Sequence, residues 1–298
     1  MALTRIDRVI AVYLLFVTVV IVVRGPFHGP FPWLLTTHAL VFLLLWLFTR
    51  TAADARVGRV LHTLYPLLLL MPLYTEVGML NVQLGVAHVL AHDVIVQRWE
   101  QAIFGTQIAY TWIRTYPSVF WSGLLHLDYM SYYPIIFLGP VLLVAQGRHD
   151  AARRVLLTTM AAYLVCFAVF ILFPVAGPNY AFPHPTGPVR NVWSARIVYR
   201  LLAGGSSVGA AFPSSHVAAT VATVLAVRRE WPALAAVFAL PCALLVVAVV
   251  YCQMHYGVDA LSGLGLGIAI AMATGRLRVT TADATSRTAR LARAARPA

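Results

Sequence analysis

Long apolar runs separated by short polar breaks fill most of the chain. A helix needs about 20 apolar residues to cross a bilayer, and runs of about 15 suffice where flanking residues snorkel or the bilayer thins. Eight runs meet this criterion, at residues 9–23, 33–49, 60–80, 119–145, 154–174, 213–227, 232–251 and 256–275. The pattern predicts an all-α fold, a polytopic membrane helix bundle of about eight transmembrane helices that forms one domain over residues 1–275.

The composition is that of a membrane protein, and the C-terminal residues differ from the rest of the chain. Of 298 residues, 60% are hydrophobic and 11% are charged, which excludes a soluble domain of this length. Residues 276–298 carry arginines among small polar side chains, and we expect a basic, disordered cytoplasmic tail there. Cys166, Cys242 and Cys252 are odd in number and lie in or beside apolar runs, so no disulfide framework is expected.

The distribution of arginine predicts the orientation of the chain. The sequence contains no lysine, and its net charge of +12 comes from arginine alone. If eight spans alternate, sixteen of the 22 arginines fall on the side that holds both termini. Cytoplasmic segments carry an excess of positive residues, so we expect both termini in the cytoplasm of a multi-pass protein of the plasma membrane, the inner membrane in a bacterium. The positive charge is thus explained by membrane topology, and no nucleic acid partner is expected. The sequence carries no signal for an oligomeric state.

Two mixed segments, 81–118 and 175–212, fall on the exoplasmic side in this topology. The first has the pattern of a helix in the headgroup layer whose first part ends at Gly105, with Arg98 and Glu100 paired on a solvated face. The second is rich in proline and glycine, and we expect irregular structure there with a short helix around residues 191–202.

A first polar motif, Pro213-Ser214-Ser215-His216, opens the sixth apolar run. Proline suits the first helical position, because its missing N–H is one that a helix start leaves unpaired. Free amides and the positive end of the helix dipole make such a start an anion site, to which the Ser214 and Ser215 hydroxyls add donors. Ionisable groups are costly within a bilayer, so His216 in the same turn is a functional candidate.

A second polar motif, with His255 and Asp259 at i, i+4 spacing, opens the last run. On a helix these two side chains share one face. A carboxylate bonded to one ring nitrogen would fix the tautomer and leave the lone pair of the other nitrogen free to attack. The arginine count places the starts of both runs on the exoplasmic side. Isolated histidines elsewhere, such as His38 and His62, are expected to be hydrogen-bonded structural residues.

The two motifs together resemble the type 2 phosphatidic acid phosphatase (PAP2) superfamily, whose hallmark is P-S-x-H followed by H-x-x-x-D on a later helix. This resemblance implies a PAP2-like core in which His255 is the nucleophile and forms a phosphohistidine. It implies that Asp259 orients His255 and that His216 protonates the leaving oxygen. Ser214 and Ser215 would bind phosphate oxygens.

The chain departs from the family pattern at two places. The family's third motif usually begins Ser-Arg, but positions 248 and 249 are Ala and Val, and the lysine-containing first motif is missing. A phosphate still needs neutralising charge, so we expect substrate-binding arginines in the preceding loop, at Arg190, Arg196 or Arg200. Tyr129 either lines a headgroup pocket or belongs to an interfacial aromatic belt.

Three further stretches resemble the inositol phosphorylceramide synthase-like branch of the superfamily. They are Tyr74-Thr75-Glu76 with Asn81, Asp93 through Glu100 to Phe104-Gly105, and Tyr129 to Tyr133. Members of that branch transfer a phosphorylated headgroup between lipids, whereas others are phosphatases.

Residues and resemblance together predict an enzyme, a lipid-phosphate phosphatase that acts through a phosphohistidine at the exoplasmic face on a membrane lipid phosphate. One alternative is a headgroup phosphotransferase, for which an acceptor lipid is the second partner. Another is a non-catalytic carrier or transporter that binds the same headgroup. A zinc site made by two histidines and an aspartate is the rival chemistry, but no fourth ligand is evident, and we expect neither a metal nor another cofactor.

Overall fold

A computed structural model describes residues 3–24, 31–50, 56–205 and 207–294, with side chains as far as Arg276 apart from those of residues 49, 86 and 205. The described residues form helices, and the one β-bridge among them joins Val175 to Ala210. In chain order the helices are α1 (Arg5–Arg24), α2 (Phe31–Arg50), α3 (Arg56–Val82), α4 (Val86–Phe104), α5 (Ile108–Thr115), α6 (Val119–Tyr129), α7 (Tyr132–Ala145), α8 (His149–Leu172), α9 (Pro178–Ala181), α10 (Pro188–Asn191), α11 (Trp193–Gly205), α12 (Ser215–Glu230), α13 (Pro232–Tyr251) and α14 (Gly257–Ala294).

The all-α polytopic bundle predicted from the sequence is confirmed. Within the described residues, seven helical segments are long and apolar enough to cross a membrane, and one of them, 119–145, consists of α6 and α7. The predicted span at 213–227 corresponds to α12, which has 16 residues. At about 1.5 Å per residue α12 is about 24 Å long, less than the roughly 30 Å of a hydrocarbon core.

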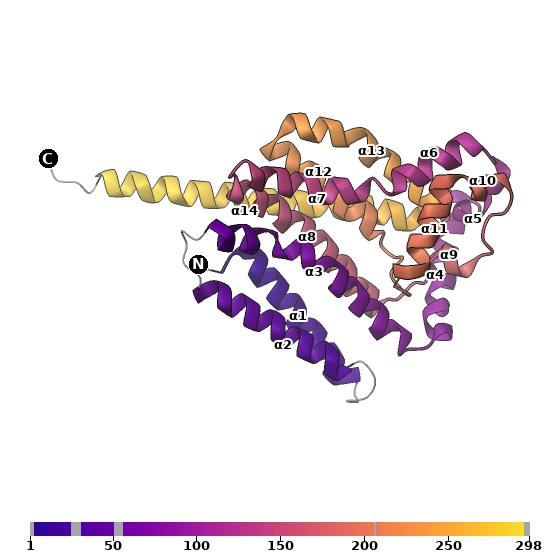
Figure 1. Cartoon of the computed structure of the whole chain (residues 1–298), viewed down its shortest axis with the longest axis horizontal. Coiled ribbons are helices and arrows are strands. Elements are labelled where there is room, and N and C mark those ends of the chain that lie inside the picture. The colour runs from indigo at the N-terminus through magenta and orange to yellow at the C-terminus, as the bar shows by residue number, and fades with distance from the viewer. Residues whose placement is uncertain (1–2, 25–30, 51–55, 206, 295–298) are drawn as a thin grey trace.

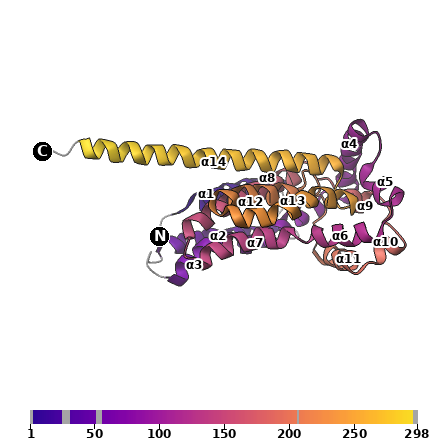
Figure 2. The same ribbon diagram turned by 90° about the horizontal axis from the view of Figure 1, so that it is seen from above.

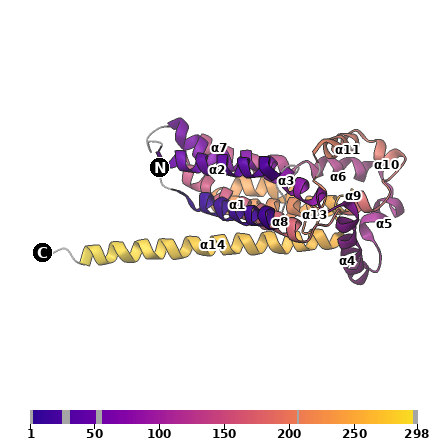
Figure 3. The same ribbon diagram turned by 90° about the horizontal axis from the view of Figure 1, so that it is seen from below.

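The short helices gather at one end of the bundle (Figure 1). Helices α4, α5, α9, α10 and α11 come from the two segments that the sequence places on one side of the membrane, and all lie at this end in each view (Figures 2 and 3). The start of α1 and the far part of α14 lie at the opposite end (Figure 1). The cytoplasmic location of that opposite end stays a prediction from the arginine distribution.

Helix α12 is the central element of the bundle. It packs against α8, α13, α14 and α7, and its buried residues are mostly alanine, valine and threonine, which allow close approach. Glycines of α14 face it: a Cβ at Gly263 would lie 2.5 Å from the Ser214 carbonyl oxygen, and one at Gly267 would lie 2.5 Å from that of Ala218. Gly265, between them, has open space. The close contact of α12 with α14 fixes the relative position of the two polar motifs.

Buried polar pairs attach the first two helices to α3. His38 Nε2 on α2 lies 2.6 Å from Glu76 Oε1 on α3, and His62 Nε2 on α3 lies 2.9 Å from Asp7 Oδ2 on α1. The Tyr65 hydroxyl donates to the other oxygen of Asp7 at 2.6 Å. These contacts are the structural hydrogen bonds expected for isolated histidines.

The C-terminal segment differs from its sequence-based description. We expected a disordered tail from residue 276, whereas α14 continues as helix to Ala294. Residues 287–294 are mostly alanine, arginine and leucine, which have high helix propensity, so the segment can extend the preceding helix by local preference.

Candidate active site

The starts of α12 and α14 bring two imidazole rings together at the end of the bundle that carries the short helices. His216 is the second residue of α12, and His255 lies two residues before α14 begins. The Nδ1 atom of His216 is 3.2 Å from Nε2 of His255, which is hydrogen-bonding distance. His255 is buried and His216 is half-buried.

A backbone carbonyl sets the tautomer of His255. Nδ1 of His255 lies 2.9 Å from the carbonyl oxygen of Ala211. A carbonyl can only accept, so Nδ1 carries the proton, and in the neutral ring Nε2 carries the lone pair. That lone pair faces His216, whose Nδ1 must then donate. The arrangement leaves Nε2 of His255 unprotonated, as a nucleophile requires.

The Asp259 carboxylate lies near the hydrogen bond between His255 and the Ala211 carbonyl. Its Oδ2 is 3.6 Å from Nδ1 of His255, within ion-pair range but longer than a hydrogen bond. The same oxygen accepts from the Tyr256 amide at 2.8 Å, and the Asp259 carbonyl accepts from the Ser214 amide at 3.0 Å. Ala211 thus accepts from the ring, and Asp259 places a carboxylate next to it; the orienting role of Asp259 stays a prediction.

The serines of the first motif have different surroundings. Ser214 is the N-cap of α12, and its hydroxyl accepts from the Val217 amide at 3.4 Å. The backbone amide of Ser214 already donates to the Asp259 carbonyl, so this amide is not one of the free donors that we expected at the anion site. Ser215 is the buried first residue of the helix. The substrate-binding roles of Ser214 and Ser215 stay predictions.

Two tyrosines from the break between α6 and α7 complete the surroundings of His216. The Tyr129 hydroxyl is 3.3 Å from Nε2 of His216, and the Tyr132 ring packs edge-on against the imidazole with centroids 4.5 Å apart. Since Nδ1 of His216 is the donor to His255, its Nε2 accepts from Tyr129 in the neutral ring. One directed chain of hydrogen bonds therefore runs from Tyr129 through His216 and His255 to Ala211.

The structure does not bring the three expected arginines to the imidazoles. Arg190 lies with its guanidinium 4.7 Å from the centre of the Tyr199 ring. Arg196 and Arg200 are exposed on α11. In the described part of the chain none of the three contacts His216 or His255.

A fourth arginine, Arg114 on α5, is attached to the segment that carries His255. Its guanidinium donates at 2.7 Å to the side chain of Gln253, two residues before the nucleophile candidate. It also donates to the carbonyl oxygens of Tyr110 at 2.6 Å and Pro183 at 2.5 Å. These three partners are neutral, so the charge of Arg114 is not cancelled by them. Burial lowers the pKa of His184, and the nearby charges of Arg190 and Arg114 lower it further.

Gln253 holds the loop between α13 and α14 in a left-handed conformation. Its φ is 60°, the one positive value at a non-glycine residue within the described chain. The side-chain amide donates to the carbonyl oxygens of Pro178 and Pro183, each at 3.1 Å. A residue other than glycine pays roughly 1–2 kcal/mol of conformational free energy in the left-handed conformation, and these hydrogen bonds offset that cost.

Two buried carboxylates of α4 support the site from outside. Asp93 accepts from the amides of Ala176 at 2.7 Å and Gly177 at 2.8 Å, and from the Tyr256 hydroxyl at 2.9 Å. The adjoining Val175 carbonyl accepts from the amide of Ala211, whose carbonyl binds His255. Asp93 thus fixes the loop that presents the Ala211 carbonyl.

Glu100 holds the start of α14. Its two oxygens accept from the amides of Gly257 and Val258, each at 3.0 Å, directly after the nucleophile candidate. The expected pairing of Glu100 with Arg98 on a solvated face is wrong, because Glu100 is fully buried and faces α14. Burial raises the pKa of Glu100, and the bonds from the amides oppose this shift. The predicted end of this helix at Gly105 is confirmed, since Gly105 caps it in the left-handed conformation.

Within the residues whose side chains the structure describes, no group of three or more His, Cys, Asp or Glu side chains is arranged to hold a metal ion. The facing nitrogens of His216 and His255 bond to each other, and the remaining nitrogens bond to Tyr129 and Ala211. The arrangement can therefore supply an unprotonated nitrogen next to a proton donor.

Comparison with known proteins places this geometry in a family. A model of the PAP2 superfamily matches residues 95–273, more than half of the chain. The matched region contains both histidine motifs, Glu100 and Arg114. No curated protein and no solved structure matches the chain significantly. The superfamily generally comprises phosphatases and phosphotransferases, which agrees with a nucleophile beside a proton donor. The chain belongs to the PAP2 superfamily.

Proposed function

We propose that the protein is a membrane phosphatase that releases phosphate from a lipid phosphate ester at the exoplasmic face. The observation that carries the proposal is the directed hydrogen-bond chain, which leaves Nε2 of His255 unprotonated and 3.2 Å from Nδ1 of His216. A phosphoryl group entering between the two rings would meet a lone pair on one side and a donor on the other.

The proposed reaction has two steps. In the first, Nε2 of His255 attacks phosphorus, the bond from phosphorus to the lipid oxygen breaks, and His216, protonated once the anionic phosphate is bound, gives its proton to that oxygen. In the second, neutral His216 takes a proton from water, and the resulting hydroxide attacks the phosphohistidine to release phosphate and restore His255. The negative charge of Asp259 beside the ring stabilises the positive charge that develops on His255.

We assign the neutralisation of the phosphate charge to Arg114, in place of the loop arginines expected from the sequence. Its hydrogen bond to Gln253 lies next to the segment that carries His255, and its three hydrogen-bond partners are neutral. Substituting Arg114 with Gln should raise KM or lower kcat by about tenfold or more, the cost of one charge-assisted hydrogen bond. The matched substitution Arg196→Gln, at an exposed position on α11, should leave both constants unchanged.

A second candidate function is transfer of the phosphorylated headgroup to an acceptor lipid. The stretch from Asp93 to Glu100, one of the three that resemble the inositol phosphorylceramide synthase-like branch, contacts both loops of the site. The two functions share the phosphohistidine step and differ in whether water or a lipid hydroxyl takes the phosphoryl group.

Product analysis separates the candidates. The purified protein, with chelator present, is incubated with a panel of lipid phosphates and acceptor lipids, and products are measured by mass spectrometry. Free phosphate with dephosphorylated lipid supports the phosphatase, and a new headgroup on an acceptor supports the transferase. His255→Ala should give neither product, whereas His88→Ala, which removes an exposed imidazole on α4, should act as wild type. An active His255→Ala variant would overturn both candidates, and absence of product with wild type would favour a lipid-phosphate carrier.

A further inference from the structure

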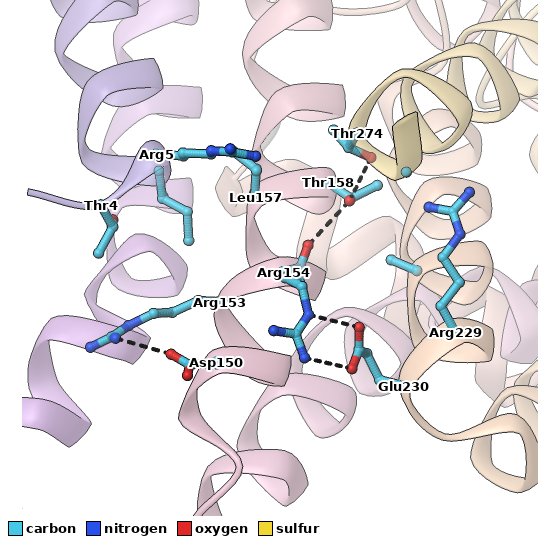
Figure 4. Close-up of a pocket in the computed structure, with 13 residues that line it drawn as sticks. Thr4, Arg5, Asp150, Arg153, Arg154, Leu157, Thr158, Arg229, Glu230 and Thr274 are labelled. Atoms are coloured by element: carbon cyan, nitrogen blue, oxygen red, sulfur yellow. Dashed lines mark hydrogen bonds and ion pairs between the residues drawn. The ribbon is translucent and has the colours of Figure 1, made fainter. Parts of the chain in front are cut away.

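A second site-like feature lies at the opposite end of the bundle from the paired imidazoles. A cavity of about 450 Å³ opens between the starts of α1 and α8, the end of α12 and α14 (Figure 4). Along α12, His216 and Arg229 are 13 residues apart, which corresponds to about 20 Å. The volume is in the range of pockets that hold small ligands, about 300–1,000 Å³. The cavity is therefore separate from the proposed active site and independent of its function.

The lining of this cavity is positive. Four arginines, Arg5, Arg153, Arg154 and Arg229, face two acids, Asp150 and Glu230, which leaves the lining with two net positive charges. The acids differ in how far they cancel this charge. Glu230 is held by Arg154 in a two-pronged contact, with both N–O distances 2.9 Å (Figure 4).

The charge of Arg153 is weakly compensated. Its closest acid, Asp150, lies 3.5 Å away with its side chain 84% exposed to solvent, so the pair is weak. Its Nε atom is buried and has no hydrogen-bond partner among the described residues. A buried cationic donor without a partner is costly, and an anion in the cavity would remove that cost.

The walls of the cavity are apolar beside the charges. Ile6 from α1, Leu157 from α8 and Ala226 from α12 line it. Figure 4 shows Leu157 between Arg5 and the hydroxyl of Thr158, which bonds Thr274 on α14 at 2.9 Å. A ligand that fits both kinds of wall carries an anionic group and an apolar chain, as a phospholipid does.

We propose that this cavity binds the phosphate headgroup of an anionic phospholipid from the leaflet at the end of the bundle that holds the chain termini. That end carries sixteen of the 22 arginines in the predicted alternation of spans, and the cytoplasmic leaflet is rich in anionic lipid. Arg153 and Arg5 contact the phosphate, Leu157 and Ile6 contact the upper part of an acyl chain, and the Arg154–Glu230 pair closes the inner wall. The bound lipid would link α1, α8 and α12.

The test uses the full-length protein in detergent and native mass spectrometry to count bound phosphatidylglycerol. Arg153→Gln removes one charge from the cavity, and Arg228→Gln removes one from the same end of α12 outside it. We expect Arg153→Gln to lose one bound lipid, with about tenfold weaker binding, and Arg228→Gln to bind as wild type. Leu157→Phe, which fills the cavity without changing charge, should give the same loss as Arg153→Gln.

Two controls distinguish a lipid from other sources of phosphate and from the active site. Neutral phosphatidylcholine should not occupy the cavity, and inorganic phosphate should not displace phosphatidylglycerol at similar concentration. Turnover of Arg153→Gln should remain at the wild-type rate in detergent, because the cavity lies far from His255. Equal lipid binding by Arg153→Gln and Arg228→Gln would overturn the proposal, and so would occupancy by inorganic phosphate alone.

Discussion

Glu100→Gln tests whether a residue outside the reacting groups positions the nucleophile. The substitution preserves the shape of the side chain but leaves one acceptor oxygen where there were two. Glutamine can then satisfy the amide of Gly257 or that of Val258, and the other amide is left buried opposite an NH₂ group. Losing one bond to a charged acceptor costs about 1.5–3 kcal/mol.

Removal of the buried negative charge of Glu100 offsets part of this loss of stability. Burial raises the pKa of Glu100, so the carboxylate is disfavoured in the folded protein above that pKa. Because the folded-state pKa of Glu100 is raised, this group contributes stability in acid, and that contribution is lost as the pH rises through the folded-state pKa. Glutamine does not ionise, so Glu100→Gln does not show this pH-dependent loss of stability. We therefore expect a small change in stability, about 1–2 kcal/mol.

The effect on catalysis should be larger than the effect on stability. A small displacement of the start of α14 moves His255 against His216, and a misplacement of about 1 Å can cost about 10²-fold in rate. We expect kcat of Glu100→Gln to fall about 10- to 100-fold with KM nearly unchanged, and the melting temperature to fall by a few degrees. Arg98→Gln, exposed on the same helix, is the matched control. A wild-type kcat in Glu100→Gln, or an equal loss in Arg98→Gln, would refute the positioning role.

Three further substitutions follow from the geometry of the site. Gly263→Ala should lower both the melting temperature and kcat, because its Cβ would lie 2.5 Å from the Ser214 carbonyl, whereas Gly265→Ala, which points into open space, should be neutral or slightly stabilising; equal effects would contradict the packing argument. Gln253→Ala should be less stable than Gln253→Gly by about 1 kcal/mol in chemical denaturation, since both lose the same bonds but only alanine is strained at a φ of 60°, and the reverse order would show that strain is unimportant. Asp259→Asn should lower kcat by about 10²- to 10⁴-fold in a phosphate-release assay without unfolding, because the charge beside His255 is lost, and a rate within threefold of wild type would argue against that role.

The apolar runs and the two motifs made much of the fold and the centre of the site predictable. Each run is helical, with the run at 119–145 divided into α6 and α7, because backbone groups in a bilayer must be satisfied within the segment. The pairing of His216 with His255 follows from two motifs that each open a helix on the same side. The run at 213–227 corresponds to α12, the 16-residue helix that begins at the site.

Contacts between distant segments could not be read from the sequence. Arg114 and Gln253 are 139 positions apart, and no periodicity links them. Glu100 lies in a mixed segment where a buried and a solvated carboxylate look alike in sequence. The partner of His255 at Ala211 is a backbone carbonyl, which every residue possesses, so residue identity carries no signal for it.

Detection of the covalent intermediate tests the central claim most directly. The wild-type protein is mixed with a lipid phosphate, quenched under alkaline conditions that preserve phosphohistidine, and digested for peptide mass spectrometry. The account predicts one phosphoryl group on His255 during turnover, absent from His255→Ala. Turnover with no phosphorylated His255, or with the phosphoryl group on another residue, would contradict it.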